Sequence, residues 1–446
     1  MDGKFNAYAM RAVPRYTSYP TAPHFSHAVT PAITQSWLDE LSPDMQLSVY
    51  LHVPFCRHMC AYCGCHTKVS KQDGPLVDYA TSLRDEIRLV GDKITAGAKV
   101  RHIHWGGGTP SLLPTDQLTA VVADLAESFT FADDFEHAME LDPRSVTPEL
   151  VACLRDIGIN RVSLGVQDFD ADVQVAIGRV QPFEQVEETI SMLRDVGIEA
   201  INFDLIYGLP RQTLESFERT AELTSDLAPS RIALFGYAHV PWFKKHQRLI
   251  DEAELPGAQA RMDLESASRA AFQRRGYVPI GLDHFARPDD PLATAAENGV
   301  LHRNFQGYTT DCADALIGLG ASSISKYPQG YAQNAPDLGN WRRSVANNEL
   351  SIAKGKAFSD DDRLRGRVIE DLMTNYTADF ADLIAADPAC ESELRDELNL
   401  LAADGLANVD GTRVTVNPDA RMLVRIVAAV FDAYLETSVK RHSVAV

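Results

Sequence analysis

The sequence contains no run of about eighteen consecutive apolar residues, the length that a membrane-spanning helix requires. Its best candidate, residues 422–435, is interrupted by Arg425 and Asp432. The first ten residues, MDGKFNAYAM, lack the apolar segment that is typical of a signal peptide. The sequence therefore predicts a cytoplasmic protein that does not cross a membrane.

Basic residues are too few to balance the acidic ones. The chain has 42 Lys and Arg against 62 Asp and Glu, which gives a formal net charge of −20. This charge argues against non-specific nucleic-acid binding and against docking on an anionic membrane, because both need a basic surface. It does not exclude a small anionic substrate, since a pocket can hold arginines within an acidic shell. The sequence also has no internal repeat and no low-complexity segment.

Cysteine is scarce and unevenly placed. Only seven cysteines occur in 446 residues, and four of them lie within ten residues of one another. Paired structural disulfides are not distributed in this way, and a long cytosolic chain favours a metal or redox site. The clustered cysteines are Cys56, Cys60, Cys63 and Cys65, and the scattered ones are Cys153, Cys312 and Cys390.

From about residue 47 the sequence alternates short apolar runs with helix-like segments, the pattern of parallel βα units. Six expected strands fit an open, incomplete barrel better than a closed one with eight strands, and the chemistry should lie where the strands end. The expected strands are Ser48–Val53, Val100–Trp105, Phe135–Leu141, Arg161–Val166, Ala200–Tyr207 and Arg231–Tyr237. The expected helices between them are Leu76–Val90, Thr115–Glu127, Thr147–Ile157, Phe183–Val196 and Thr213–Leu227.

The two ends of the chain differ from this central pattern. Residues 1–45 are irregular and predict an N-terminal extension over the active site, whereas residues 46–350 hold the barrel and its elaborations. Within them we expect a helix at Ala258–Arg275 and a long loop at Gly281–Thr310. Residues 351–446 predict a mainly helical, winged-helix-like domain. Its expected helices are Asp360–Thr374, Phe380–Ala386, Cys390–Ala403 and Asp419–Leu435, with a hairpin turn at Val409–Thr412.

The cysteine cluster reads C-x3-C-x2-C-x-C and follows the first expected strand directly. Three thiolates on one short loop can hold a [4Fe–4S] cluster through Cys56, Cys60 and Cys63, leaving one iron open to chelate S-adenosylmethionine. Zinc is the alternative, but zinc sites usually combine such a pair with a second, distant pair, which this sequence lacks. A redox dithiol fits the spacing less well. The role of Cys65 stays open: it can bind iron, serve the chemistry or fill space.

The sequence resembles the radical S-adenosylmethionine superfamily and, within it, the oxygen-independent coproporphyrinogen III oxidases. The resemblance covers nearly the whole chain. It rests on PRYTSYPT at 14–21, YLHVPFC at 50–56, HWGGGTP at 104–110, ELDPR at 140–144, GVQDF at 165–169, DLIYGLP at 204–210, DHFARPDD at 283–290 and HRNFQGYTT at 302–310. The related haem chaperones usually lack the fourth cysteine and the PRYTSYP stretch, so the resemblance favours the oxidases.

This resemblance implies a partial (β/α)6 barrel, an α/β fold, with an N-terminal extension and a helical C-terminal domain. It implies Cys56, Cys60 and Cys63 as cluster ligands, and Tyr50, Cys65 and Glu140 as catalytic residues. It also implies two molecules of S-adenosylmethionine. Their expected contacts are Tyr50, Gly107, Gly108, Thr109, Glu140, Gln167, Arg179, Asp204 and Ala238, with Phe305, Gln306 and Ile324 at the second molecule.

The implied reaction converts two propionates of coproporphyrinogen III to vinyl groups, giving protoporphyrinogen IX in haem biosynthesis. Its carboxylates need arginines, because a buried unpaired carboxylate is costly and Arg offers a bidentate fork. The candidates are Arg15, Arg179, Arg287 and Arg303. The implied partners are the substrate and an electron-donating system such as flavodoxin or ferredoxin, acting on a monomer. The alternatives are a haem chaperone and another radical enzyme that acts on a tetrapyrrole.

Overall fold

The computed structural model describes residues 4–94 and 97–435. Its centre is one twelve-stranded sheet, which contains the six expected parallel strands side by side. These strands are β1 (Gln46–Val53), β4 (Lys99–Gly107), β5 (Thr130–Leu141), β6 (Arg161–Gln167), β7 (Ala200–Tyr207) and β8 (Arg231–Gly236). The prediction of a six-stranded partial barrel is therefore confirmed.

The sheet continues beyond the six strands at both ends. On the β1 side it adds β13 (Ala315–Leu319), which runs parallel to β1, and then β14 (Ile324–Tyr327), β15 (Gly330–Asn334) and β16 (Ile352–Ala357). On the β8 side it adds β10 (His284–Ala286), which is antiparallel to β8, and then β9 (Val278–Ile280), which is antiparallel to β10. The sheet order ends at β16 and β9, so the barrel is open. The edge strand β16 lies beyond residue 350.

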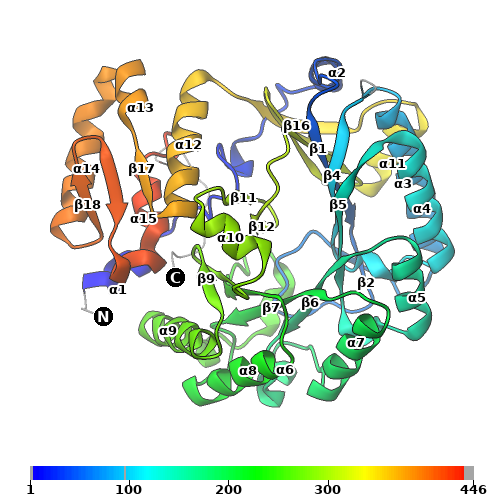
Figure 1. Ribbon diagram of the computed structural model, residues 1–446, viewed down its shortest axis with the longest axis horizontal. Helices are drawn as coiled ribbons and strands as arrows, with labels where there is room; N and C mark the ends of the chain where they lie inside the picture. Colours follow the sequence, from blue (N-terminus) through cyan, green and yellow to red (C-terminus); the bar gives the residue numbers. More distant parts are fainter. Residues whose placement is uncertain (1–3, 95–96, 436–446) are drawn as a thin grey trace.

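The helices that connect the parallel strands form the outer layer, which runs down the right and along the bottom in Figure 1. The side chain of Thr147 accepts a hydrogen bond from the Leu150 N–H, and Thr213 forms a capping box with Ser216, as expected for helix starts. These helices are α3 (Gly74–Gly91), α4 (Thr115–Ser128), α5 (Pro148–Asp156), α6 (Ala171–Ala176), α7 (Phe183–Asp195) and α8 (Leu214–Asp226). The layer continues with α9 (Ala258–Arg274), which follows β8 and leads to the edge strand β9 (Figure 1).

The expected long loop at 281–310 is wrong. This segment contains β10, helix α10 (Pro291–Glu297) and the hairpin of β11 (His302–Asn304) and β12 (Gly307–Thr309). Each strand has only three residues. Three residues are too few to show an alternating apolar pattern, so periodicity could not reveal them.

The C-terminal part contains α12 (Asp360–Asn375), α13 (Ala381–Ala386) and α14 (Glu391–Ala403), as expected. A small sheet combines β17 (Thr377–Asp379) with the predicted hairpin of β18 (Ala407–Asp410) and β19 (Arg413–Val416). The expected final helix is wrong in its extent. It is a 3-10 turn followed by α15 (Val424–Ala429), and residues 430–435 form turns.

The N-terminal extension reaches both other parts of the chain. Its first helix, α1 (Lys4–Ala9), lies beside the C-terminal elements at the left of Figure 1, where the Tyr8 hydroxyl donates to Asp404 at 2.5 Å. Its second helix, α2 (Pro31–Asp39), lies near the β16 end of the main sheet (Figure 1). Outside the extension, α11 (Leu338–Ala346) packs against α3. The extension therefore bridges the C-terminal elements and the sheet.

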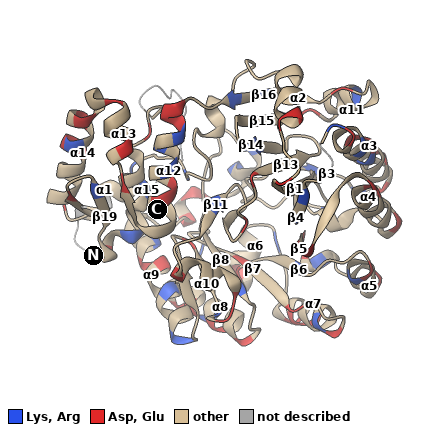
Figure 2. Cartoon of the chain, turned by 45° about the horizontal axis from the view of Figure 1, so that its top comes forward, with Lys and Arg blue, Asp and Glu red and all other residues tan. Residues whose placement is uncertain are grey.

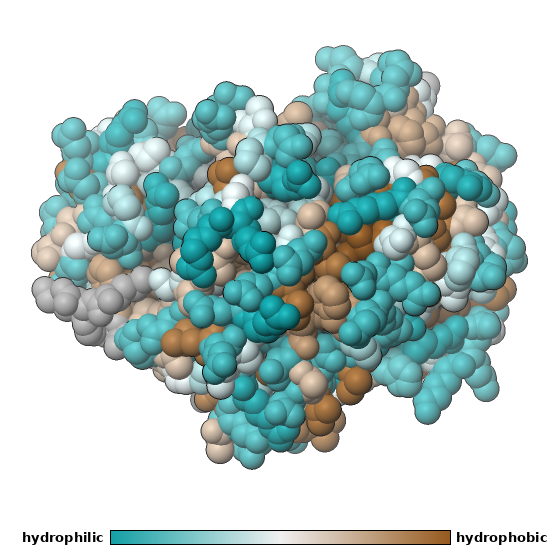
Figure 3. Space-filling view, turned by 60° about the horizontal axis from the view of Figure 1, so that its bottom comes forward, coloured by the Kyte–Doolittle hydropathy of each residue, from teal (hydrophilic) through white to brown (hydrophobic). Residues whose placement is uncertain are grey.

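The charged residues, blue and red in Figure 2, lie mainly on the helices, while the central strands are mostly tan, the colour of uncharged residues. Figure 3 shows a mostly hydrophilic face on which hydrophobic residues gather in a few separate areas. Among the described residues, no helix combines the length and the apolar character needed to span a bilayer.

Candidate active site

The loops after the parallel strands surround a cavity of about 530 Å³. Because parallel strands end at the same edge of the sheet, residues far apart in the sequence meet here. The three predicted cluster ligands, Cys56, Cys60 and Cys63, all line this cavity. All three are free cysteines.

The backbone of the following strand and turn fixes the cysteine loop. The N–H groups of Gly108 and Thr109 donate to the carbonyls of Val53 and Phe55 at 2.9 and 2.8 Å. A Cβ on Gly108 would lie 2.5 Å from the Phe55 oxygen, so this close approach requires glycine. Short strands β2 (Phe55–Cys56) and β3 (Lys68–Val69) pair within the loop. Gly108 thus holds the loop in place as well as lining the cavity.

A second segment, which sequence reasoning missed, holds the loop from outside. Lys244 Nζ donates to the Cys65 carbonyl at 2.9 Å, and His246 Nε2 contacts the Cys63 carbonyl at 2.7 Å. Gln247 Nε2 donates to the Tyr62 carbonyl at 2.8 Å. These side chains bind backbone oxygens about 180 residues away and belong to no motif, so no sequence signal could have found them.

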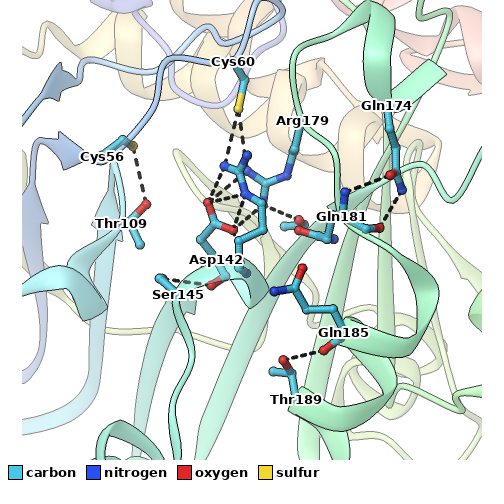
Figure 4. A network of polar contacts seen from close by, with 12 residues as sticks. Cys56, Cys60, Thr109, Asp142, Ser145, Gln174, Arg179, Gln181, Gln185 and Thr189 are labelled. Carbon is cyan, nitrogen blue, oxygen red and sulfur yellow. Dashed lines mark hydrogen bonds and ion pairs between the residues drawn. The ribbon is translucent and has the colours of Figure 1, made fainter. Parts of the chain in front are cut away.

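Two arginines point at the middle cysteine. Arg144 and Arg179 each donate to Cys60 Sγ at 3.7 Å, and both also bind the Asp142 carboxylate, as Figure 4 shows for Arg179. Burial raises the pKa of Asp142, but the hydrogen bond from Arg144 and the charge of Arg179 outweigh it, so its pKa is lowered. Asp142 thereby orients both guanidinium groups. Arg144 was missed as a site residue, although the quoted ELDPR motif contains it.

Cys56 and the last two cysteines have different surroundings. Cys56 Sγ lies 3.4 Å from the hydroxyls of both Thr109 and Thr67. A hydrogen bond with Cys65 lowers the pKa of Cys63 to about 6, and the same contact raises the pKa of Cys65. Cys65 also lines a second, adjoining cavity of about 690 Å³.

Tyr50 and Glu140 lie together where β1, β4 and β5 end. The Tyr50 hydroxyl lies 2.9 Å from His52 Nδ1, and Glu140 accepts from the Gly107 N–H at 3.2 Å. A Cβ on Gly106 would lie 2.8 Å from Glu140 Oε1, so glycine leaves room for this carboxylate. Burial lowers the pKa of His52 to about 4, which keeps its ring neutral. The structure therefore brings these two expected site residues together.

The expected residues on β6 and β7 face the same cavity, together with Ala238 after β8. Gln167 ends β6 with a positive φ of 70°, and Arg179 donates to the Gly165 carbonyl at 2.6 Å. Asp204 accepts from Ser163 and from Asn202, both at 2.9 Å. Burial raises the pKa of Asp204 to about 6 despite these hydrogen bonds.

The three residues expected at a second S-adenosylmethionine lie in the larger, adjoining cavity. Phe305, Gln306 and Ile324 line it together with Tyr50, and none of the three lines the cysteine cavity. The two cavities share wall residues, including Cys65, Glu140 and Asp204. The site therefore has two chambers that meet at these side chains.

The four arginines expected to bind the propionates do not lie in one place. Arg179 and Arg15 line the cysteine cavity, and Arg15 donates to the Gly236 carbonyl at 2.8 Å. Arg303 lines two smaller cavities farther from the cysteines. Arg287 lies half exposed, 3.6 Å from Asp289, and lines none of the four cavities described here.

The donor set around the cysteines fits an iron–sulfur cluster. The three predicted ligands line one cavity together with Cys65, hydroxyls contact Cys56, and two guanidinium groups at Cys60 can offset thiolate charge. Within residues 4–94 and 97–435, no three His, Cys, Asp or Glu side chains converge closely enough to hold a single metal ion.

Comparison with known proteins identifies the family. Residues 50–224 match the model of the radical SAM superfamily, which confirms the predicted [4Fe–4S] cluster and S-adenosylmethionine as cofactors. The oxygen-independent coproporphyrinogen III oxidase of Bradyrhizobium diazoefficiens is 48% identical over 99% of this chain and 98% of its own length. The Escherichia coli protein of the same name is 40% identical over 95% of this chain and 93% of its own length.

A solved structure is described as coproporphyrinogen III oxidase from Escherichia coli and as a radical SAM enzyme. Its match with this protein covers 95% of this chain and 100% of the solved chain. It superimposes with a TM-score of 0.89 at 38% identity. The similarity thus extends through the barrel, the N-terminal extension and the C-terminal elements. This chain belongs to the family of oxygen-independent coproporphyrinogen III oxidases, within the radical SAM superfamily.

Proposed function

We propose that this protein converts two propionates of coproporphyrinogen III to vinyl groups without oxygen, giving protoporphyrinogen IX in haem biosynthesis. The observation that supports this most is the pair of adjoining chambers, one lined by the three predicted cluster ligands and the other large enough for part of a macrocycle. The names of the relatives agree with this reaction.

In the proposed reaction each propionate loses carbon dioxide, one hydrogen atom and one electron, and a carbon–carbon double bond forms. When bound, the cluster and S-adenosylmethionine supply the one-electron cleavage that yields a radical able to remove this hydrogen atom. The protein must hold the propionate beside this chemistry and keep water away from it.

The residues around the cysteine chamber suit the binding of the first S-adenosylmethionine. The Gly106–Gly108 backbone approaches without side chains, and Glu140 and Asp204 provide carboxylates for an amino group or ribose hydroxyls. Arg179 provides a guanidinium for a carboxylate. We propose Thr109, Gln167 and Ala238 as further contacts.

We place a second S-adenosylmethionine in the larger chamber, against Phe305, Gln306 and Ile324. Cys65 and Glu140 lie on the wall that both chambers share, and Tyr50 lines the larger one. We propose these three as catalytic residues, since Cys65 and Glu140 on this boundary can contact both the cofactor and the reacting propionate, and Tyr50 lies beside Glu140.

We further propose an electron-donating partner such as flavodoxin or ferredoxin, a monomeric state and a cytoplasmic location. The chain is divided here into an extension (1–45), a barrel (46–350) and a C-terminal domain (351–446). Because β16 belongs to the main sheet, we propose moving the last boundary to about residue 358.

Product mass tests the reaction. Protein reconstituted anaerobically with iron and sulfide is incubated with coproporphyrinogen III, S-adenosylmethionine and dithionite, and the oxidised products are separated by mass. We expect loss of two carbon dioxide units together with formation of 5′-deoxyadenosine. Stable haem binding without vinyl product would indicate a haem chaperone, and a methylated or ring-opened product would indicate another radical enzyme.

A further inference from the structure

The larger chamber of the site adjoins two smaller cavities that lead away from the cysteines. The first, of about 180 Å³, shares Asn304, Phe305 and Thr309 with the larger chamber. The second, of about 390 Å³, shares Thr17, Arg303 and Lys326 with the first. The three cavities therefore form a row from Cys65 to the C-terminal part of the chain.

Four basic residues line the last two cavities, and we call them the basic arm. They are Arg303, Lys326, Arg363 and Arg367. Arg303 belongs to β11 and Lys326 to β14, while the other two lie one turn apart on α12, which packs against β11. Three segments of the chain thus bring positive charge to one place in a protein with a net charge of −20.

The acidic residues beside the basic arm are engaged with other groups. Glu370 contacts His302 at 3.1 Å, and Asp362 accepts from the Ser359 N–H at 2.9 Å and from the Tyr434 hydroxyl at 2.6 Å. Asp362 also lies 3.5 Å from Lys356, outside the arm. Lys326 and Glu370 line both cavities, and despite burial the hydrogen bond with His302 and the charge of Lys326 lower the pKa of Glu370.

A third carboxylate, Asp311, lines the smaller cavity and contacts His102 at 3.2 Å and the Ser48 hydroxyl at 2.6 Å. Outside these cavities, Arg303 pairs with Asp283 and Arg367 lies 3.9 Å from Asp382. Four cations therefore line these cavities with three carboxylates, each of which already has a partner.

Arg303 carries the strongest indication of a missing ligand. Its side chain is only 4% exposed and lies 3.5 Å from Asp283, yet its Nε and Nη1 make no hydrogen bond among the described residues. Its guanidinium also lies over the Tyr308 ring, 4.4 Å from the ring centre. Buried N–H donors normally have partners, so an acceptor such as a carboxylate fits here.

We propose that the basic arm binds the two propionates of coproporphyrinogen III that the enzyme leaves intact. This inference rests on the proposed function, in which two of four propionates react beside the cysteine chamber. The other two carry negative charge that must be matched once the macrocycle leaves water. The row of cavities places matching cations on the far side of the larger chamber, which selects the orientation of the substrate.

The N-terminal extension completes the wall of the arm. Tyr16, Thr17, Ser18 and Tyr19 line its outer cavity opposite α12. Tyr16 donates to Asp432 at 3.1 Å, and the Ala433 N–H donates to the Tyr19 hydroxyl at 3.1 Å. The extension and the C-terminal part are thus fixed to each other at the place where the proposed carboxylates bind.

Another carboxylate could compete for the same cations, namely the amino-acid end of a second S-adenosylmethionine, because Phe305 lines the adjacent cavity. The test therefore measures both ligands on reconstituted protein. Coproporphyrin III, the oxidised and stable form of the substrate, is titrated by fluorescence, and S-adenosylmethionine binding is measured by equilibrium dialysis. The tetramethyl ester of coproporphyrin III serves as a probe of the same shape without carboxylates.

The variants are Lys326→Gln, Arg363→Gln and the double variant. Arg219→Gln, on the exposed surface of α8, removes the same charge far from the cavities and serves as the control. We expect the double variant to bind coproporphyrin III about tenfold more weakly, which corresponds to the loss of one to two charge-assisted contacts. Binding of the tetramethyl ester and of S-adenosylmethionine should be unchanged, and the control should match the wild type.

Three results would overturn the proposal: unchanged coproporphyrin III affinity, an equal loss for the ester, or weaker S-adenosylmethionine binding instead. Failure of the proposed function has a different signature. If the wild type forms no vinyl product, the proposed reaction is contradicted. The binding titrations still test whether the basic arm binds the carboxylates of coproporphyrin III. If the wild type is active, the variants should raise KM and change kcat little.

Discussion

The Arg179 guanidinium lies between the Asp142 carboxylate, at 3.2 Å, and the Cys60 sulfur, at 3.7 Å. Asp142 thus orients a positive charge toward a predicted cluster ligand. Hydrogen bonds and charge at cysteine sulfurs help to set the reduction potential of an iron–sulfur cluster. Any change to this contact should therefore affect the cluster before it affects the fold.

We expect Arg179→Gln to bind a full cluster with a more negative reduction potential, because the variant removes one cation and one N–H donor from Cys60. Turnover should fall about tenfold or more, as expected for loss of a hydrogen bond to a charged group. The potential is measured by a redox titration followed by electron paramagnetic resonance. The exposed Arg155→Gln is the control, and an unchanged potential in Arg179→Gln would contradict the assignment.

The close approach of Gly108 to the cysteine loop gives a second prediction. Gly108→Ala places a methyl group 2.5 Å from the Phe55 carbonyl oxygen and must displace the loop. We expect less than half of the wild-type iron content after reconstitution, with the helical circular dichroism retained. Gly74→Ala is the matched control, because a Cβ there meets nothing within 4 Å, and it should bind iron normally.

Separate substitutions of two cysteines test the ligand assignment. Cys56→Ser should abolish the cluster absorbance after anaerobic reconstitution, whereas Cys65→Ser should retain iron and sulfide near the wild-type amount. Cys65 is exposed toward both chambers, so its variant should instead lose vinyl formation. Loss of iron in Cys65→Ser would show that this residue is a ligand.

A buried histidine should make stability depend on pH. Burial lowers the pKa of His137 to about 4 from its ordinary value of 6.5, and Trp105 donates to its Nε2 at 2.9 Å. The folded protein therefore binds fewer protons than the unfolded chain between these values. The contribution of the neutral His137 ring to the free energy of unfolding is fully present above pH 6.5 and is lost as the pH falls toward 4.

His137→Gln keeps an acceptor for Trp105 but does not titrate. We expect the free energy of unfolding of the wild type to fall by about 1 kcal/mol more than that of the variant between pH 7.5 and 5.5. Urea unfolding at several pH values measures this difference. Parallel pH profiles for the two proteins would rule out a neutral buried ring at this position.

The long elements were predictable because each repeats its pattern several times. The eight residues of β7 show a regular alternation in burial, and their predicted bounds, Ala200–Tyr207, match the structure. The three-residue strands at 284–309 have no room for such a pattern. The final helix was overextended because residues 424–428 are buried on all sides, which gives no clear end to the apolar run.

The site was predictable where its signal is local in the sequence. The spacing of Cys56, Cys60 and Cys63 placed them on one loop, and the structure places them in one cavity. Contacts to backbone carbonyls leave no such signal, so the support from Lys244 and His246 could not be foreseen. The two-chamber arrangement likewise depends on where the β11–β12 hairpin lies relative to β14 of the main sheet.

The position of β1 within the sheet has a consequence for how the protein matures. The strand that leads into the cysteine loop pairs with β4 on one side and with β13 on the other. During synthesis β1 can therefore not pair with its second neighbour, β13, until residues 315–319 have been made. The surroundings of the cysteines cannot be complete until most of the chain has been synthesised, so we expect iron and sulfide to be loaded late, after residues 315–319 have joined the sheet.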